Sequence, residues 1–159
     1  MKVTGHGEYL TKLTRGGFVN AYLVQEDDGL TLVDTMLPRS EKGILEAAQS
    51  LGAPIVRIAL THAHQDHVGS VDALKAALPD AEVLITGRDA RFLSGDKSLD
   101  PDEGGKARGA YVKIATQPTR LINPGERVGD RFIAGKDGSS KGVSALVQGF
   151  IRCTNRPYT

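Results

Sequence analysis

The stretch that decides this fold is residues 61–69, Thr-His-Ala-His-Gln-Asp-His-Val-Gly, which contains three of the four histidines of the chain. Imidazole is the commonest metal-binding side chain, and a carboxylate is its natural oxygen partner at a metal site. Four such groups, His62, His64, Asp66 and His67, directly follow a short apolar run. A helix-capping role would explain Asp66, but it gives no reason for the two histidines before it. The stretch therefore predicts a metal site.

The spacing of these groups predicts two pairs of ligands. Residues two apart on an extended chain point the same way, so His62 and His64 can reach one ion together. Asp66 and His67 follow where the loop turns into a helix, so they face a neighbouring position. Two ions about 3.5–4 Å apart can hold a bridging hydroxide and polarise the bond that it attacks. We therefore expect one or two metal ions at this loop.

The chain around this loop alternates between strand-like and helix-like patterns. The expected elements are a hairpin of residues 18–24 and 30–34, a helix over 40–51, a strand at 55–60, a helix over 71–78, a strand at 82–86 and a helical turn at 90–93. This order predicts an α/β protein with helices packed on a sheet. The metal loop would then lie at the C-terminal end of a buried strand, where α/β folds place their sites.

The pattern is weaker beyond residue 93. Residues 94–109 are rich in glycine and charged residues, which predicts a long exposed loop. Residues 135–142 are typical of a linker. Shorter features are expected as strands at 112–115, 120–122 and 143–151 and as a turn at 123–126.

Composition limits the class of protein. A chain of 159 residues suits one domain, and a net charge of +1 gives no electrostatic footprint for nucleic acid or an anionic membrane. Residues 1–6 contain no apolar signal core, and no apolar stretch approaches the length that spans a bilayer. Cys153 is the only cysteine, which fits a reducing cytoplasm. We therefore expect a cytoplasmic protein that acts on a small molecule, without nucleic-acid or membrane partners.

Residues 61–69 resemble the His-x-His-x-Asp-His motif of the metallo-β-lactamase superfamily. The hairpin ending Leu-Val-Asp-Thr at residues 32–35 resembles the first motif of that family, and the resemblance covers about residues 15–130. It implies an αβ/βα sandwich and a zinc-dependent hydrolase with two metal positions. Such an enzyme would use a metal-bound hydroxide to attack an ester, thioester, lactone or amide bond.

The resemblance also implies a role for each residue of the site. His62 and His64 would serve the first zinc ion, and Asp66 and His67 would serve the second. Asp66 would in addition be catalytic, because it would orient the attacking hydroxide or help to protonate the leaving group. Asp34 resembles the carboxylate that lies behind a ligating histidine and fixes its tautomer. From spacing alone, Asp34 is equally well explained as a polar residue that closes a strand.

The chain departs from the family pattern after His67. Family members supply two more histidines and a bridging aspartate from later in the chain, but no histidine follows His67 here, and the remaining one is His6. Asp130 and Asp137 are the candidates for a replacement carboxylate. We therefore expect residues 1–130 to form a partial domain of this family, in which the N-terminal half of the sandwich is present and the C-terminal half is largely missing or altered. Residues 131–159 would form an atypical tail.

A half-sandwich would leave one apolar face of its sheet uncovered. Three explanations stay open: a short natural variant, a partner chain such as a second copy in a homo-oligomer, and a truncated or frame-shifted gene. Two functions follow from the same residues. The resemblance favours a zinc hydrolase, and the missing ligands favour a catalytically inactive remnant or metal-binding module with an incomplete site. A third reading is an obligate dimer that borrows ligands between chains, with His6 as a donor.

Overall fold

The structure is a computed structural model that describes residues 1–101, 105–123 and 125–131. Within these residues the strands are β1 (Lys2–His6), β2 (Leu10–Arg15), β3 (Val19–Glu26), β4 (Gly29–Val33), β5 (Ile55–Ala59), β6 (Glu82–Thr86) and β7 (Arg120–Ile122). The helices are α1 (Glu41–Ser50), α2 (Gln65–Val68), α3 (Val71–Ala77) and α4 (Gly87–Ser94). None of these helices is long and apolar enough to cross a membrane.

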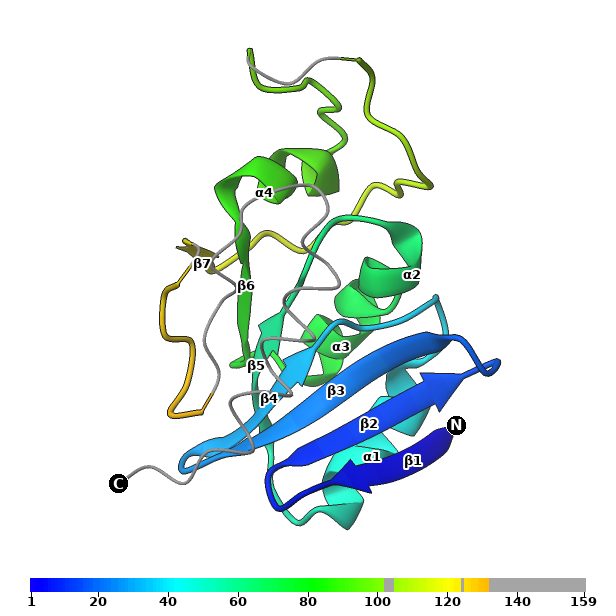
Figure 1. Ribbon diagram of the computed structural model, residues 1–159, viewed down its shortest axis with the longest axis vertical. Coiled ribbons are helices and arrows are strands. Elements are labelled where there is room, and N and C mark those ends of the chain that lie inside the picture. The colour runs from blue at the N-terminus through cyan, green and yellow to red at the C-terminus, as the bar shows by residue number, and fades with distance from the viewer. Residues whose placement is uncertain (102–104, 124, 132–159) are drawn as a thin grey trace.

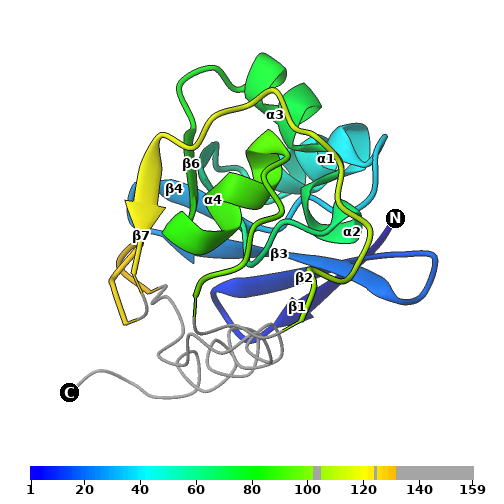
Figure 2. The same ribbon diagram turned by 90° about the horizontal axis from the view of Figure 1, so that it is seen from above.

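All of these strands belong to one sheet, in which their spatial order equals their order along the chain. Strands β1 to β4 pair antiparallel, and strands β4 to β7 pair parallel. Parallel neighbours need crossover connections, and the helices lie in those connections. Successive right-handed crossovers in one direction along the sheet place their helices on the same face. The helices accordingly gather on one side of the sheet (Figures 1 and 2).

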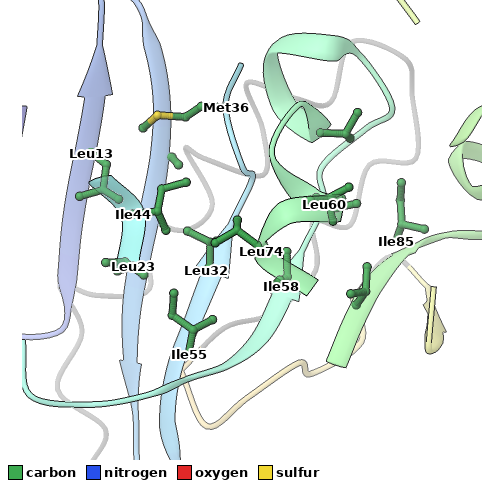
Figure 3. Close-up of a cluster of buried hydrophobic side chains, with 14 of the residues drawn as sticks. Leu13, Leu23, Leu32, Met36, Ile44, Ile55, Ile58, Leu60, Leu74 and Ile85 are labelled. Carbon is green, nitrogen blue, oxygen red and sulfur yellow. The ribbon is translucent and has the colours of Figure 1, made fainter. Parts of the chain in front are cut away.

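The main core lies between the sheet and these helices. Alternate residues of the strands point toward the helices, because successive side chains of a strand face opposite sides. Leu23, Leu32 and Ile58 from the sheet pack in one buried cluster with Ile44 of α1 and Leu74 of α3 (Figure 3). This packing fixes α1 and α3 on the sheet, and with them the loops at the C-terminal ends of β4 and β5.

A second apolar cluster lies on the other face of the sheet. Its buried members are Leu10, Val24, Val33, Ala59, Leu84, Ile122 and Val128. Each of them is at most 5% exposed, contrary to the expectation of an uncovered face. Val128 comes from the segment after β7, which returns to the end of β3: the backbone N–H of Arg131 donates to Glu26 Oε2 at 2.6 Å. The predicted homo-oligomer stays a prediction.

The structure confirms the predicted α/β class and most of the predicted elements. The hairpin is β3 and β4, the two predicted helices are α1 and α3, and the helical turn at 90–93 is part of the longer helix α4. Strands β1 and β2 and the short helix α2 were not predicted. The predicted strand at 112–115 is wrong, because these residues form no strand, and the isolated bridge nearby joins His64 to Tyr111, the residue before them. The linker at 135–142, the strand at 143–151 and the tail from residue 132 onward lie outside the described residues.

Candidate metal centre

The candidate centre lies where β4 and β5 end. These strands are parallel neighbours, so their C-terminal ends meet at the same edge of the sheet. Asp34 directly follows β4, and the loop 60–64 directly follows β5 and leads into α2. The short helix α2 holds Asp66 and His67, so all five residues that the sequence indicated lie on adjacent segments.

The four predicted ligands form two pairs. His62 Nε2 lies 3.0 Å from His64 Nδ1, and His67 Nε2 lies 3.5 Å from the Oδ2 atom of Asp66. The rings of His62 and His67 are 4.0 Å apart between centroids, so the two pairs are neighbours. Zinc binds histidine nitrogen and carboxylate oxygen at about 2.0–2.2 Å, so the two atoms of each pair are close enough to share one ion.

The donor chemistry therefore fits zinc, but each pair supplies only half of a tetrahedral shell. Over the part of the chain that the structure describes, no three His, Cys, Asp or Glu side chains are grouped as a metal site. Metal binding by His62, His64, Asp66 and His67 thus stays a prediction, and the remaining ligands would have to come from water, substrate or other groups.

Asp34 is the buried polar residue behind the second pair. It is 2% exposed, and a buried carboxylate is costly unless it accepts hydrogen bonds. Its Oδ1 atom accepts from the Thr61 backbone N–H at 2.8 Å, and its Oδ2 atom lies 2.7 Å from His67 Nδ1. A carboxylate only accepts, so Nδ1 of His67 carries the proton and Nε2 is left to face Asp66. This is the contact that the predicted role of Asp34 requires.

The backbone at Asp34 is unusual, with a φ of 62°. A positive φ is uncommon outside glycine, although aspartate and asparagine tolerate it better than other residues. The conformation turns the chain sharply at the end of β4 while Asp34 keeps its contacts with Thr61 and His67. Backbone strain of this kind concentrates at functional sites.

Thr61 connects the first pair to the same carboxylate. Its hydroxyl lies 2.8 Å from Asp34 Oδ2 and 3.0 Å from His62 Nδ1. A hydroxyl can donate and accept at once, so it donates to Asp34 and accepts from the Nδ1–H of His62. The Nε2 atom of His62 is then free to face His64. One buried carboxylate thus organises a histidine in each pair.

The pKa values of His62 and His67 are shifted in opposite directions. Burial, with help from the nearby His67, lowers the pKa of His62 to about 4. Burial also opposes a charge on His67, but the hydrogen bond that His67 donates to Asp34 and the negative charge of that carboxylate outweigh this effect, and the pKa of His67 is raised. His62 is therefore neutral at pH 7, which is the form that binds a metal ion.

Sequence reasoning missed two sets of residues at this centre. Asp89 in the first turn of α4 accepts from the Ala63 backbone N–H at 3.3 Å, and burial raises the pKa of its carboxyl group. Its spacing from Thr86, the N-cap of α4, is a capping signal that could have drawn attention to it. The other set is residues 108–111, where the Arg108 carbonyl lies 3.0 Å from His64 Nε2. No sequence pattern marks this contact.

The other candidate ligands lie elsewhere. His6 ends β1, the edge strand, which two further strands separate from β4. Asp130 accepts from the backbone N–H of Asp27 at 2.9 Å, in the turn that precedes β4, whereas the candidate centre lies where β4 ends. Asp137 lies outside the described residues. In the described part of the chain, neither His6 nor Asp130 joins the candidate centre.

Comparison with known proteins points to one family. The family model of the metallo-beta-lactamase superfamily matches residues 14–143. An uncharacterized Bacillus subtilis protein, YobT, is 44% identical over 131 residues, which are 81% of this chain and 56% of that protein. A probable metallo-hydrolase of Streptococcus pyogenes is 32% identical over 95 residues, which are 60% of this chain and 38% of that protein.

Among solved structures, the subclass B3 metallo-beta-lactamase BJP-1 of Bradyrhizobium japonicum superposes with a TM-score of 0.60 and 26% identity. The match covers 82% of this chain and 49% of that enzyme. The chain therefore spans about half the length of YobT and of BJP-1, and in the family's architecture this is the N-terminal half of the sandwich.

Proposed function

The chain belongs to the metallo-beta-lactamase superfamily, and from this we propose that it is a zinc-dependent hydrolase that cleaves an ester, thioester, lactone or amide bond in a small molecule. The observation that carries the proposal is the pair of oxygen atoms that lie behind the two donor pairs, at His62 Nδ1 and at His67 Nδ1. Asp34 and Thr61 hold the Nδ1 protons of His67 and His62, so both histidines present Nε2 toward the neighbouring ligand. A histidine cluster without metal chemistry gives no reason for this order.

His62 and His64 would hold one zinc ion, and Asp66 and His67 would hold a second. Zinc, when bound, supplies a Lewis acid and activates water as a nucleophile near neutral pH. The Asp66 side chain is 51% exposed, so one of its oxygens can reach a substrate while the other faces His67. It would orient the attacking water and carry a proton toward the leaving group, which is the usual work of a general acid and base.

A second candidate function rests on the number of ligands. Each pair offers two donors, and no histidine follows His67 in the 159 residues. A site with two protein ligands per ion holds metal weakly. On this reading the chain is a metal-binding module or an inactive remnant with an incomplete site. The count of bound zinc ions and the activity together separate the two candidates.

The test begins with the metal-free chain and a matched set of variants. We expect the wild type to bind close to two zinc ions, measured by elemental analysis after dialysis, if it is the hydrolase. His62→Ala and His64→Ala should lose the first ion, and His6→Ala, which changes a histidine on the edge strand β1, should not.

Activity is measured on p-nitrophenyl acetate, an acyl thioester, a simple lactone and a chromogenic β-lactam. Hydrolysis of at least one of these should be lost with a chelator and restored by zinc. Fewer than one ion per chain, together with no hydrolysis, would leave the metal-binding remnant as the better description.

We propose a cytoplasmic location on the evidence of the single cysteine, Cys153. A homo-oligomer that completes the sheet is also proposed, and a measured molar mass of one chain would contradict it.

A further inference from the structure

Residues 108–111, called here the covering segment, lie against the loop that holds the first donor pair. The Ala110 carbonyl accepts from the Gln65 backbone N–H at 2.8 Å, and Tyr111 forms a bridge with His64. The Tyr111 ring also packs between two other rings, 4.8 Å from that of His64 and 5.0 Å from that of Phe92 in α4. Figures 1 and 2 show this yellow-green stretch passing beside α2 on its way from α4 to β7. The segment is therefore held on two sides, by α2 and by α4.

The contact that matters for the metal centre is made by a backbone carbonyl. The Arg108 oxygen lies 3.0 Å from His64 Nε2. A carbonyl only accepts hydrogen bonds, so a neutral His64 must carry its proton on Nε2. The lone pair of the ring is then on Nδ1, which is the atom that lies 3.0 Å from His62 Nε2. The covering segment thus selects which nitrogen of His64 is available to an ion.

His62 and His64 differ in this respect. The Nδ1 partner of His62 is the Thr61 hydroxyl, which donates its own proton to Asp34 and therefore accepts from the Nδ1–H of His62. His62 thus carries its proton on Nδ1, whereas the Arg108 carbonyl holds the proton of His64 on Nε2. The lone pairs of His62 Nε2 and His64 Nδ1 then face each other across 3.0 Å, so they cannot share a hydrogen bond but can share an ion.

Gly109 is the residue that makes this close approach sterically feasible. Its φ is +123°, and a Cβ atom at this position would lie 2.2 Å from His64 Nε2 and 2.7 Å from two ring carbons. A rigid ring that is bonded at Nε2 and faces His62 at Nδ1 cannot simply turn aside. Gly105, in the same loop, has a similar φ of +100° and no atom within 4 Å of the equivalent position. The two glycines therefore share the backbone requirement, and only Gly109 contacts the metal centre.

We infer that residues 108–111 are a positioning element for the first metal pair, in which the Arg108 carbonyl fixes the Nε2–H tautomer of His64 and Gly109 allows the contact. The inference rests on the proposed function, because it assigns a purpose to His64 Nδ1 as a ligand. Its consequence is that a segment with no ligand of its own controls the affinity of the centre. Outer partners of metal-binding histidines typically contribute about 10–100-fold to metal affinity.

The first measurement needs no metal. Long-range ¹H–¹⁵N correlation spectra of the metal-free wild type at pH 7.5 report the tautomer of each histidine, with His64→Gln for assignment. We expect His64 as the Nε2–H form. A predominantly Nδ1–H His64 would overturn the inference, whatever the protein does with zinc.

The second measurement compares Gly109→Ala with Gly105→Ala. Zinc affinity is measured by competition with a chromophoric chelator, and cobalt(II) absorption reports the ligand set. We expect Gly109→Ala to weaken the tighter-held ion by about 10–100-fold and Gly105→Ala by less than about 3-fold, with both variants folded by circular dichroism. Equal affinities in the two variants, with zinc bound normally by the wild type, would overturn the inference and leave the proposed function standing. A wild type that binds no zinc would overturn both. If Gly109→Ala does not fold, the tautomer of the wild type decides alone.

Discussion

Asp34→Asn is the substitution that tests the centre most directly, because it removes one charge without changing shape. Asparagine tolerates the positive φ of 62° at this position about as well as aspartate does, so the substitution should leave the backbone conformation unchanged. The amide oxygen can replace Oδ1 and accept from Thr61, but an NH₂ group then faces His67 Nδ1, where Oδ2 now lies at 2.7 Å. Because an NH₂ group donates, His67 must accept at Nδ1 and carry its proton on Nε2, which is the atom that faces Asp66.

The size of the effect on stability follows from the hydrogen bond between residue 34 and His67, which loses its charged acceptor. A hydrogen bond to a charged group contributes about 1.5–3 kcal/mol. His67 in its Nε2–H tautomer recovers part of this free energy, because its Nδ1 atom then accepts from the amide that replaces the Asp34 carboxylate. We therefore expect the free energy of unfolding of the metal-free protein to fall by about 1–2 kcal/mol. Zinc affinity at the second pair should fall by about 10–100-fold, because the ligand now presents a protonated nitrogen.

The assay is urea denaturation with a chelator present, followed by zinc titration of the same samples. Asp28→Asn is the matched control, because Asp28 is 55% exposed and pairs with Arg57 away from the centre. An exposed ion pair contributes about 0–1 kcal/mol, so this variant should keep its zinc and nearly all of its stability. If Asp34→Asn binds zinc with wild-type affinity and matches Asp28→Asn in stability, the proposed role of Asp34 is refuted.

Three further predictions use other parts of the molecule. In metal-free protein followed by NMR, His62 should titrate at about 4 and His67 above its usual value of about 6.5, and one shared midpoint would contradict the opposite shifts. These shifts make the free energy of unfolding depend on pH. The stabilising contribution of His67 is present below about pH 6.5 and is lost as the pH rises through its raised pKa. The contribution of His62 is present above about pH 6.5 and is lost as the pH falls toward its lowered pKa. Leu74→Ala should cost about 3 kcal/mol in urea denaturation, because this side chain is fully buried between α3 and the sheet, whereas Leu121→Ala, at 56% exposure, should cost less than about 1 kcal/mol. Asp66→Ala should fold normally and lose the second zinc ion in elemental analysis, and an unchanged zinc content would remove Asp66 from the ligands.

The elements that the sequence predicted are those with a strong local pattern. The hairpin of β3 and β4 has alternating apolar residues around an Asp-Asp-Gly turn, and α1 has apolar residues at helical spacing. Strand β1 has no such pattern, because it is an edge strand whose residues are mostly exposed. Its pairing with β2 depends on backbone hydrogen bonds, which leave no signature in side-chain polarity.

Some features of the candidate centre could likewise be predicted from the sequence and others could not. The closeness of His62, His64, Asp66 and His67 and their arrangement in two pairs could be predicted, because all four lie within six residues, and their binding of metal stays a prediction. The contact of His64 with Arg108 could not, because it joins residues 44 apart in the chain through a backbone atom. Any residue type at position 108 would offer the same carbonyl.

Which nitrogen each histidine presents is therefore a property of the fold rather than of the motif. A free histidine interchanges its two tautomers easily, so three histidines in a loop could present many combinations of lone pairs. Here the proton of each ring is assigned by an oxygen from a different place: the Asp34 carboxylate after β4 for His67, the Thr61 hydroxyl after β5 for His62, and the Arg108 carbonyl of the covering segment for His64. The first two oxygens are joined to each other by the bond from Thr61 to Asp34, and the third is not. A change in the covering segment should therefore alter the first metal position without altering the second, whereas a change at Asp34 should reach His67 directly and His62 through Thr61.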